Sequence, residues 1–179
     1  LLANAIEWGP DVGMSARMID AYKHELDAAS AILTKAHRAG LTMLAGTDSG
    51  NGPVPYGDWH ARELEYLMTY LGMSAMDALL AGTRNAAQML DMDDDIGTLE
   101  AGKLADILVV DGDPLTDITV LQDKRRLKLI MQDGKVIDTT SRLPEPEIYS
   151  WEKPQTFWPV DQVLSQEFVR KKAKNKPAW

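Results

Sequence analysis

A single carboxylate stands where an apolar stretch of the chain stops. Residues 41–45 are small or apolar, and Gly46, Thr47 and Asp48 follow at once. Such a run is typical of a strand covered on both faces, and Gly46 marks where the backbone would leave the sheet. Catalytic residues of α/β barrels lie at that edge. The pattern predicts Asp48 as a catalytic carboxylate; the alternative is that its side chain caps the next turn.

The second candidate is His60, which follows a Gly- and Pro-rich loop over 49–57. Such a loop, placed after Asp48, forms part of an active-site rim. Asp58 can cap a helix that starts there. In the first turn of that helix the dipole disfavours imidazolium, so a neutral ring can donate or accept a hydrogen bond. A surface histidine beside Trp59 is the alternative.

Two aromatic residues of the same stretch, Tyr56 and Trp59, are candidates for the wall of a substrate pocket. They can line a pocket for an apolar substrate. Aromatic side chains beside Pro and Gly also serve as loop anchors, and the sequence leaves both interpretations open.

Helices are expected on both sides of Asp48. The first ends before Gly40, a usual helix stop, and its apolar residues recur with helical period at Ile19, Tyr22, Leu26, Ala29, Leu33 and Ala36. His24 and His37 fall off this stripe, so we expect both to face solvent and neither to be a ligand. The helix after Asp58 is expected to bury Ala61, Leu64, Leu67, Met68 and Leu71.

Later segments predict structure more than chemistry. Ser74 with Asp77 resembles a capping box, and a further short helix spans 83–90, where Arg84 and Asn85 are interpreted as structural. The acidic run 91–95 lacks the spacing of a calcium loop and is interpreted as a solvated linker. Asp133-Gly134 between apolar runs predicts a β-hairpin.

Composition excludes several classes of protein. The net charge of −8 argues against a nucleic-acid partner, and no apolar run is long enough for a membrane span. The chain has no cysteine and its first residues lack signal-peptide character, which fits a cytoplasmic protein. The Pro- and aromatic-rich residues 141–179 are expected to lie along the protein body or a neighbouring subunit.

Two motifs together carry a family resemblance. Gly46-Thr47-Asp48, followed by Gly102-Lys-Leu-Ala-Asp106, resembles the C-terminal part of a metal-dependent amidohydrolase. The stretch from Tyr56 to Glu63 is similar to the branch that contains imidazolone hydrolases, prolidase-like dipeptidases and hydrolases of carbamate and phenylurea herbicides.

The resemblance implies an α/β fold. Residues 1–90 would be the last βα units of a (β/α)8 TIM barrel, with Asp48 ending the eighth strand. Residues 91–140 would belong to a small β-sandwich, followed by the tail 141–179. We therefore expect the chain to be a fragment that pairs with the missing N-terminal part of the same protein and is inactive alone.

The resemblance also implies a reaction, in which metal-activated water hydrolyses an amide, carbamate or urea C–N bond of a small molecule. One or two divalent ions, zinc by preference, would be held by Asp48 and by ligands outside this sequence. Asp48 would also transfer the proton, and His60 would bind the substrate carbonyl. The complete protein is expected to be a homo-oligomer. The alternatives are a non-catalytic scaffold of the same fold and a small independent binding domain.

Overall fold

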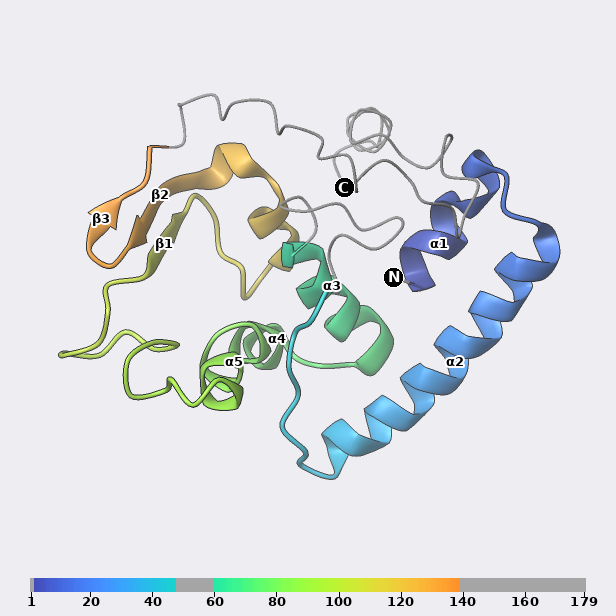
Figure 1. Ribbon diagram of the computed structural model, residues 1–179, viewed down its shortest axis with the longest axis horizontal. Helices are drawn as coiled ribbons and strands as arrows, with labels where there is room; N and C mark the ends of the chain where they lie inside the picture. The colour runs from blue at the N-terminus through green and yellow to red at the C-terminus, as the bar shows by residue number, and fades with distance from the viewer. Residues whose placement is uncertain (1, 48–59, 139–179) are drawn as a thin grey trace, which may run out of the picture. The chain divides into compact units, whose positions relative to one another are not determined.

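The computed structural model describes residues 2–47 and 60–138 (Figure 1). They divide into two compact units, residues 2–27 and residues 28–47 together with 60–138. Within these ranges, no helix combines the length and the apolar character that crossing a membrane requires. Helices and a small sheet occur together, as the predicted α/β class requires.

The first unit contains two elements that the sequence pattern did not predict. Helix α1 (Leu2–Trp8) and the 3-10 helix η1 (Gly9–Val12) precede the long helix α2 (Ala16–Arg38). Gly9 packs closely against side-chain ends, because an added Cβ would lie 2.5 Å from Cδ1 of Ile19 and 2.7 Å from Sδ of Met14, both of which would have to shift. Ile19, the first residue of the predicted apolar stripe, is buried here.

Helix α2 ends as predicted. Gly40 has a φ of +83°, which is the left-handed conformation that glycine supplies after a helix at little steric cost. Its N–H donates to the carbonyl of His37 at 2.9 Å. His24 also faces solvent as predicted, since 81% of its side chain is exposed.

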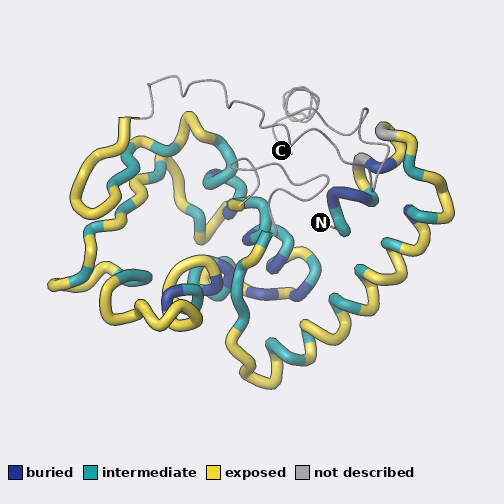
Figure 2. The backbone as a smooth tube through the Cα atoms, viewed as in Figure 1, coloured by how far each residue is buried: buried dark blue, intermediate teal, exposed yellow. Residues whose placement is uncertain are grey.

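The second unit contains three short helices, two of which supply most of its core. They are α3 (His60–Leu71), α4 (Ala75–Ala81) and α5 (Arg84–Met89). Figure 2 shows buried residues of this unit on α3, α4 and the turn between them. Burial of each leucine stabilises the folded state by about 1.5–3 kcal/mol. The core comprises Leu64, Leu67, Leu71, Met73, Ala78, Ala81 and Ile118.

The start of α4 confirms the predicted cap. The Ser74 hydroxyl accepts from the N–H of Asp77 at 3.1 Å and donates to the Asp77 carboxylate at 2.7 Å. Ser74 itself has extended backbone, as an N-cap residue should.

A three-stranded antiparallel sheet completes the second unit, in the order β1 (Ile107–Val110), β2 (Leu127–Gln132), β3 (Lys135–Val136). The 3-10 helices η2 (Ile118–Gln122) and η3 (Lys124–Arg126) connect β1 to β2. Asp133 and Gly134 both have positive φ, 50° and 72°, the signature of a two-residue hairpin turn. The predicted hairpin is therefore confirmed.

The strand expected at 42–45 is not formed. Residues 41–47, which we call the linking segment, run from α2 toward α3 as irregular backbone, and Leu41 is 59% exposed. A strand needs a neighbour to complete its hydrogen-bond ladder, and none of the described strands lies beside this segment. The apolar pattern was interpreted as a strand buried on both faces, which is wrong for the described structure, where the residues of the segment are half-buried or exposed.

Candidate functional site

The last residue of the linking segment contacts the first residue of α3. Oγ1 of Thr47 lies 3.1 Å from Nδ1 of His60, within hydrogen-bonding distance. The contact joins the end of the Gly46-Thr47 motif to the predicted first turn of the helix. His60 is exposed, so its other ring nitrogen is accessible for a second partner.

Glu63 is a second side chain of the same helical turn. It lies three positions after His60, which places both on one side of α3, and the backbone N–H of Gly46 affects the pKa of its carboxyl. Partial burial raises the pKa of the Glu63 carboxyl, and the Gly46 N–H opposes that shift by favouring the charged form. Nothing local in the sequence marks Glu63 as a site residue.

The other end of the linking segment is held by uncharged groups. The Asn85 side-chain amide donates to the carbonyl of Met43 at 3.0 Å, and the N–H of Ala45 donates to the carbonyl of Ala81 at 3.1 Å. These contacts attach the segment to α4 and α5. They agree with the structural role predicted for Asn85.

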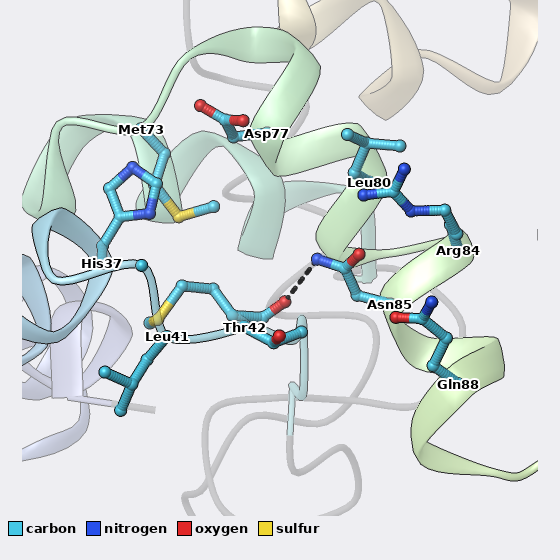
Figure 3. Close-up of a pocket in the computed structure, with 11 residues that line it drawn as sticks. His37, Leu41, Thr42, Met73, Asp77, Leu80, Arg84, Asn85 and Gln88 are labelled. Carbon is cyan, nitrogen blue, oxygen red and sulfur yellow. Dashed lines mark hydrogen bonds between the residues drawn. The ribbon is translucent and has the colours of Figure 1, made fainter.

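A polar cavity of about 240 Å³ borders this end of the segment (Figure 3). His37, Asp77 and Arg84 are among the residues that line it. The prediction that His37 faces solvent is therefore wrong, because this residue, at the C-terminal end of α2, is half-buried. The Ser74 hydroxyl lowers the pKa of Asp77, with a smaller contribution from the charge of His37. Figure 3 shows the side-chain amide of Asn85 directed at the backbone of the linking segment.

The predicted metal ligands, Asp48 and residues outside this sequence, are not among the described residues. Across 2–47 and 60–138, no three His, Cys, Asp or Glu side chains lie together as metal ligands would. Asp48, Tyr56 and Trp59 lie outside those ranges, so their predicted roles remain predictions. The acidic run 91–95 is exposed, which agrees with its interpretation as a solvated linker.

Comparison with known proteins places these features in a family context. The model of the amidohydrolase family matches residues 12–137. An imidazolonepropionase of Thermoanaerobacter pseudethanolicus is 34% identical over 110 residues, which cover 59% of this chain and 25% of that protein. An ochratoxinase of Aspergillus niger is 31% identical over 103 residues, which cover 56% and 20% of the two chains.

Solved structures agree with the sequence comparison. The crystal structure of the A. niger ochratoxinase superimposes with a TM-score of 0.62 at 27% identity, over 74% of this chain and 30% of that one. A Xaa-Pro dipeptidase gives a TM-score of 0.52 at 33% identity, over 60% and 25%. The chain thus spans a quarter or less of the length of the two relatives compared by sequence.

Proposed function

Because the chain belongs to the amidohydrolase family, we propose that it is the C-terminal portion of a hydrolase that cleaves an amide, carbamate or urea C–N bond of a small molecule. In this proposal residues up to about Leu90 complete a (β/α)8 barrel, and β1, β2 and β3 complete a small β-sandwich. Both parts would require the N-terminal remainder of the same protein. The irregular backbone of the linking segment is then a barrel strand without its neighbours.

The relatives support hydrolysis as the reaction class. An imidazolonepropionase, an ochratoxinase and a Xaa-Pro dipeptidase each match more than half of this chain. A dipeptidase hydrolyses a peptide C–N bond, which lies within the proposed substrate class. We do not choose one substrate, because the loops that would follow the other barrel strands are not in this sequence.

The observation that carries the proposal is the contact between Thr47 and His60. If the Thr47 hydroxyl donates to Nδ1 at 3.1 Å, the neutral ring carries its proton on Nε2. His60 can then donate a hydrogen bond to a substrate carbonyl oxygen. A donor at this position stabilises the negative charge that develops on the oxygen as water adds, and each such donor contributes about 2.7–4 kcal/mol.

Asp48 follows Thr47 directly and is the proposed proton carrier. It would accept the proton of the attacking water and deliver it to the leaving nitrogen, which requires a carboxylate that is ionised at the start of the reaction. A divalent ion, zinc, bound by Asp48 and by ligands outside the described residues, would lower the pKa of a water toward about 7. Tyr56 and Trp59 are proposed as walls of the substrate pocket.

The proposal also covers the location and the partners of the complete protein. We propose a cytoplasmic homo-oligomer that binds neither nucleic acid nor membrane. The net charge of −8 supports the first exclusion. The tail 141–179 would pack on the protein body or on a neighbouring subunit.

The test uses the full-length protein, with Asp48→Asn as the variant and Asp94→Asn, in the exposed acidic run, as the matched control. Turnover is measured on a panel of Xaa-Pro dipeptides, N-acyl amino acids, carbamates and phenylureas, and bound metal by elemental analysis. We expect the wild type and Asp94→Asn to bind metal and hydrolyse at least one compound. Asp48→Asn should lose turnover and bind metal more weakly.

The same experiment separates the alternative function. A full-length protein that is folded but metal-free and inactive on every class of compound would favour the non-catalytic scaffold. Full turnover by Asp48→Asn would remove Asp48 from the mechanism. Cooperative unfolding of residues 1–179 as a clean monomer would instead favour a small independent domain.

A further inference from the structure

The polar cavity beside the linking segment is lined by charged side chains that the proposed hydrolysis does not use. Its volume is about 240 Å³, which is below the roughly 300–1,000 Å³ of sites that hold drug-sized ligands. Every residue that lines it belongs to the second unit, and residues of α4, α5 and the start of the linking segment are among them. The cavity therefore has the size for a small metabolite.

Arg84 and Gln88 supply hydrogen-bond donors to one wall of the cavity. They lie four positions apart on α5, so they share one helical face. Neither side chain has a hydrogen bond or an ion pair within residues 2–47 and 60–138. A guanidinium group presents paired N–H donors that match the two oxygens of a carboxylate, and the Gln88 amide can add a further donor. This wall suits the carboxylate of a ligand.

Asp77 supplies the opposite charge from α4. The Ser74 hydroxyl donates to its carboxylate at 2.7 Å and is the main cause of its lowered pKa, to which the charge of His37 adds a smaller contribution. The carboxylate therefore stays ionised at neutral pH. Its two oxygens can accept about four hydrogen bonds in total, which leaves capacity for the ammonium group of a ligand.

The two opposite charges line one cavity without neutralising each other. In the described part of the chain no hydrogen bond or ion pair joins Asp77 to Arg84, and Figure 3 shows the two side chains apart. A ligand that carries both charges can pair with both residues. Apolar side chains of Met43, Met73 and Leu80 line the same cavity, so the ligand can also bury an apolar group there.

We propose that this cavity binds a free α-amino acid with an apolar side chain. Arg84 and Gln88 bind its carboxylate, Asp77 binds its ammonium group, and Met43 and Met73 contact its side chain. The inference goes beyond the proposed function, because it requires no turnover by the protein.

The first test measures binding to the full-length protein by calorimetry. The probes are L-leucine and two analogues that each lack one of its charges, 3-methylbutylamine without the carboxylate and 4-methylpentanoate without the ammonium group. We expect L-leucine to bind and each analogue to bind about 10- to 100-fold more weakly, because each loses one charge-assisted hydrogen-bonded contact. No heat of binding with L-leucine, L-methionine or L-phenylalanine would overturn the proposal. Equal affinity for L-leucine and either analogue would also overturn it.

Variants test which side chains bind the two charges. Arg84→Gln removes the guanidinium, and Asp77→Asn removes the negative charge while keeping an oxygen for Ser74. Each should weaken L-leucine binding by about 10- to 100-fold. Arg38→Gln and Asp94→Asn are the matched controls, because both residues are exposed and lie outside the cavity lining. Equal affinities in a variant and its control would contradict the assignment.

A spectroscopic measurement locates the ligand without relying on the variants of charged residues. The methyl ¹³C signals of Met43 and Met73 should shift when L-leucine is added to the full-length protein, whereas that of Met92, outside the lining, should not. His60→Ala should leave these shifts and the affinity unchanged. Binding that disappears in His60→Ala, or that leaves Met43 and Met73 unshifted, would place the amino acid elsewhere and overturn the proposal. An inactive wild type that shows the expected shifts would contradict only the proposed hydrolysis.

Discussion

The two ends of the linking segment are held by chemically different partners. At residues 41–45, the cavity end, neutral amide groups make the contacts: Asn85 to the carbonyl of Met43, and Ala45 to α4. At residues 46 and 47, the α3 end, the Thr47 hydroxyl contacts the ionisable ring of His60 at 3.1 Å, and burial raises the pKa of the Glu63 carboxyl while the Gly46 N–H lowers it. Neutral hydrogen bonds fix a backbone without responding to pH. Ionisable side chains can also exchange protons, so we expect the cavity end to position the segment and the α3 end to take part in the proposed reaction.

The largest effect should come from breaking the α3 end. His60→Ala removes the proposed donor to the substrate carbonyl, so kcat of the full-length protein should fall by about 10²- to 10³-fold. The free energy of unfolding should change little, because His60 is exposed. His24→Ala is the matched control, since 81% of the His24 side chain is exposed and it lies far along the sequence from the site. Equal kcat in both variants would contradict the proposed role.

The cavity end should show the opposite behaviour. Asn85→Leu leaves the carbonyl of Met43 without its donor, and a partly buried group that loses its partner costs about 1–3 kcal/mol. The free energy of unfolding of the full-length protein, measured with denaturant, should fall by that amount. The kcat of the remaining folded protein should change much less than in His60→Ala. A kcat loss as large as that of His60→Ala would erase the distinction between the two ends.

Loss of the N-cap of α4 should have a smaller effect on stability. Ser74→Ala removes the hydroxyl that accepts from the N–H of Asp77 at 3.1 Å, and loss of such a cap costs about 1 kcal/mol. It also removes the main cause of the lowered pKa of Asp77. Thermal unfolding should report a lower midpoint with unchanged turnover, whereas Ser74→Thr should retain the stability.

The smallest effect should be a pH dependence at the α3 end. The pKa of Glu63 is raised above its ordinary value of 4.5, so the folded state binds this proton more tightly than the unfolded state. The contribution of Glu63 to stability is therefore greatest below pH 4.5 and declines as the pH rises through the folded pKa. Glu63→Gln should abolish this decline, so the unfolding free energy of the variant should increase relative to that of the wild type as the pH rises. A constant difference between the two proteins across that window would contradict the raised pKa.

Local signals in the sequence predicted the elements that depend on neighbours in the chain. Gly40 ends α2, Ser74 caps α4, and Asp133-Gly134 turns the hairpin, each through backbone conformations that those residues favour. The apolar face of α3 was also predicted, because Leu64, Leu67 and Leu71 recur with helical period.

Features that depend on distant partners were missed. The strand at 42–45 requires neighbouring strands, which no pattern within those residues can supply. No local pattern marks Glu63, whose carboxyl has its pKa raised by burial in the fold, and His37 lines a cavity that α4 and α5 help to form. The candidate role of His60 rests on a local signal, its place after a Gly- and Pro-rich loop, and stays a prediction like the roles of Asp48, Tyr56 and Trp59.

The Thr47–His60 contact also determines what can change between the two residues. It joins the two residues that flank 48–59, with 3.1 Å between Oγ1 of Thr47 and Nδ1 of His60. The entropic cost of closing a loop grows only with the logarithm of its length, so doubling the length adds about 0.6 kcal/mol. Insertions and deletions between Thr47 and His60 should therefore be tolerated by the rest of the unit. Under the proposed function, substrate preference would vary there while the Thr47–His60 contact is kept.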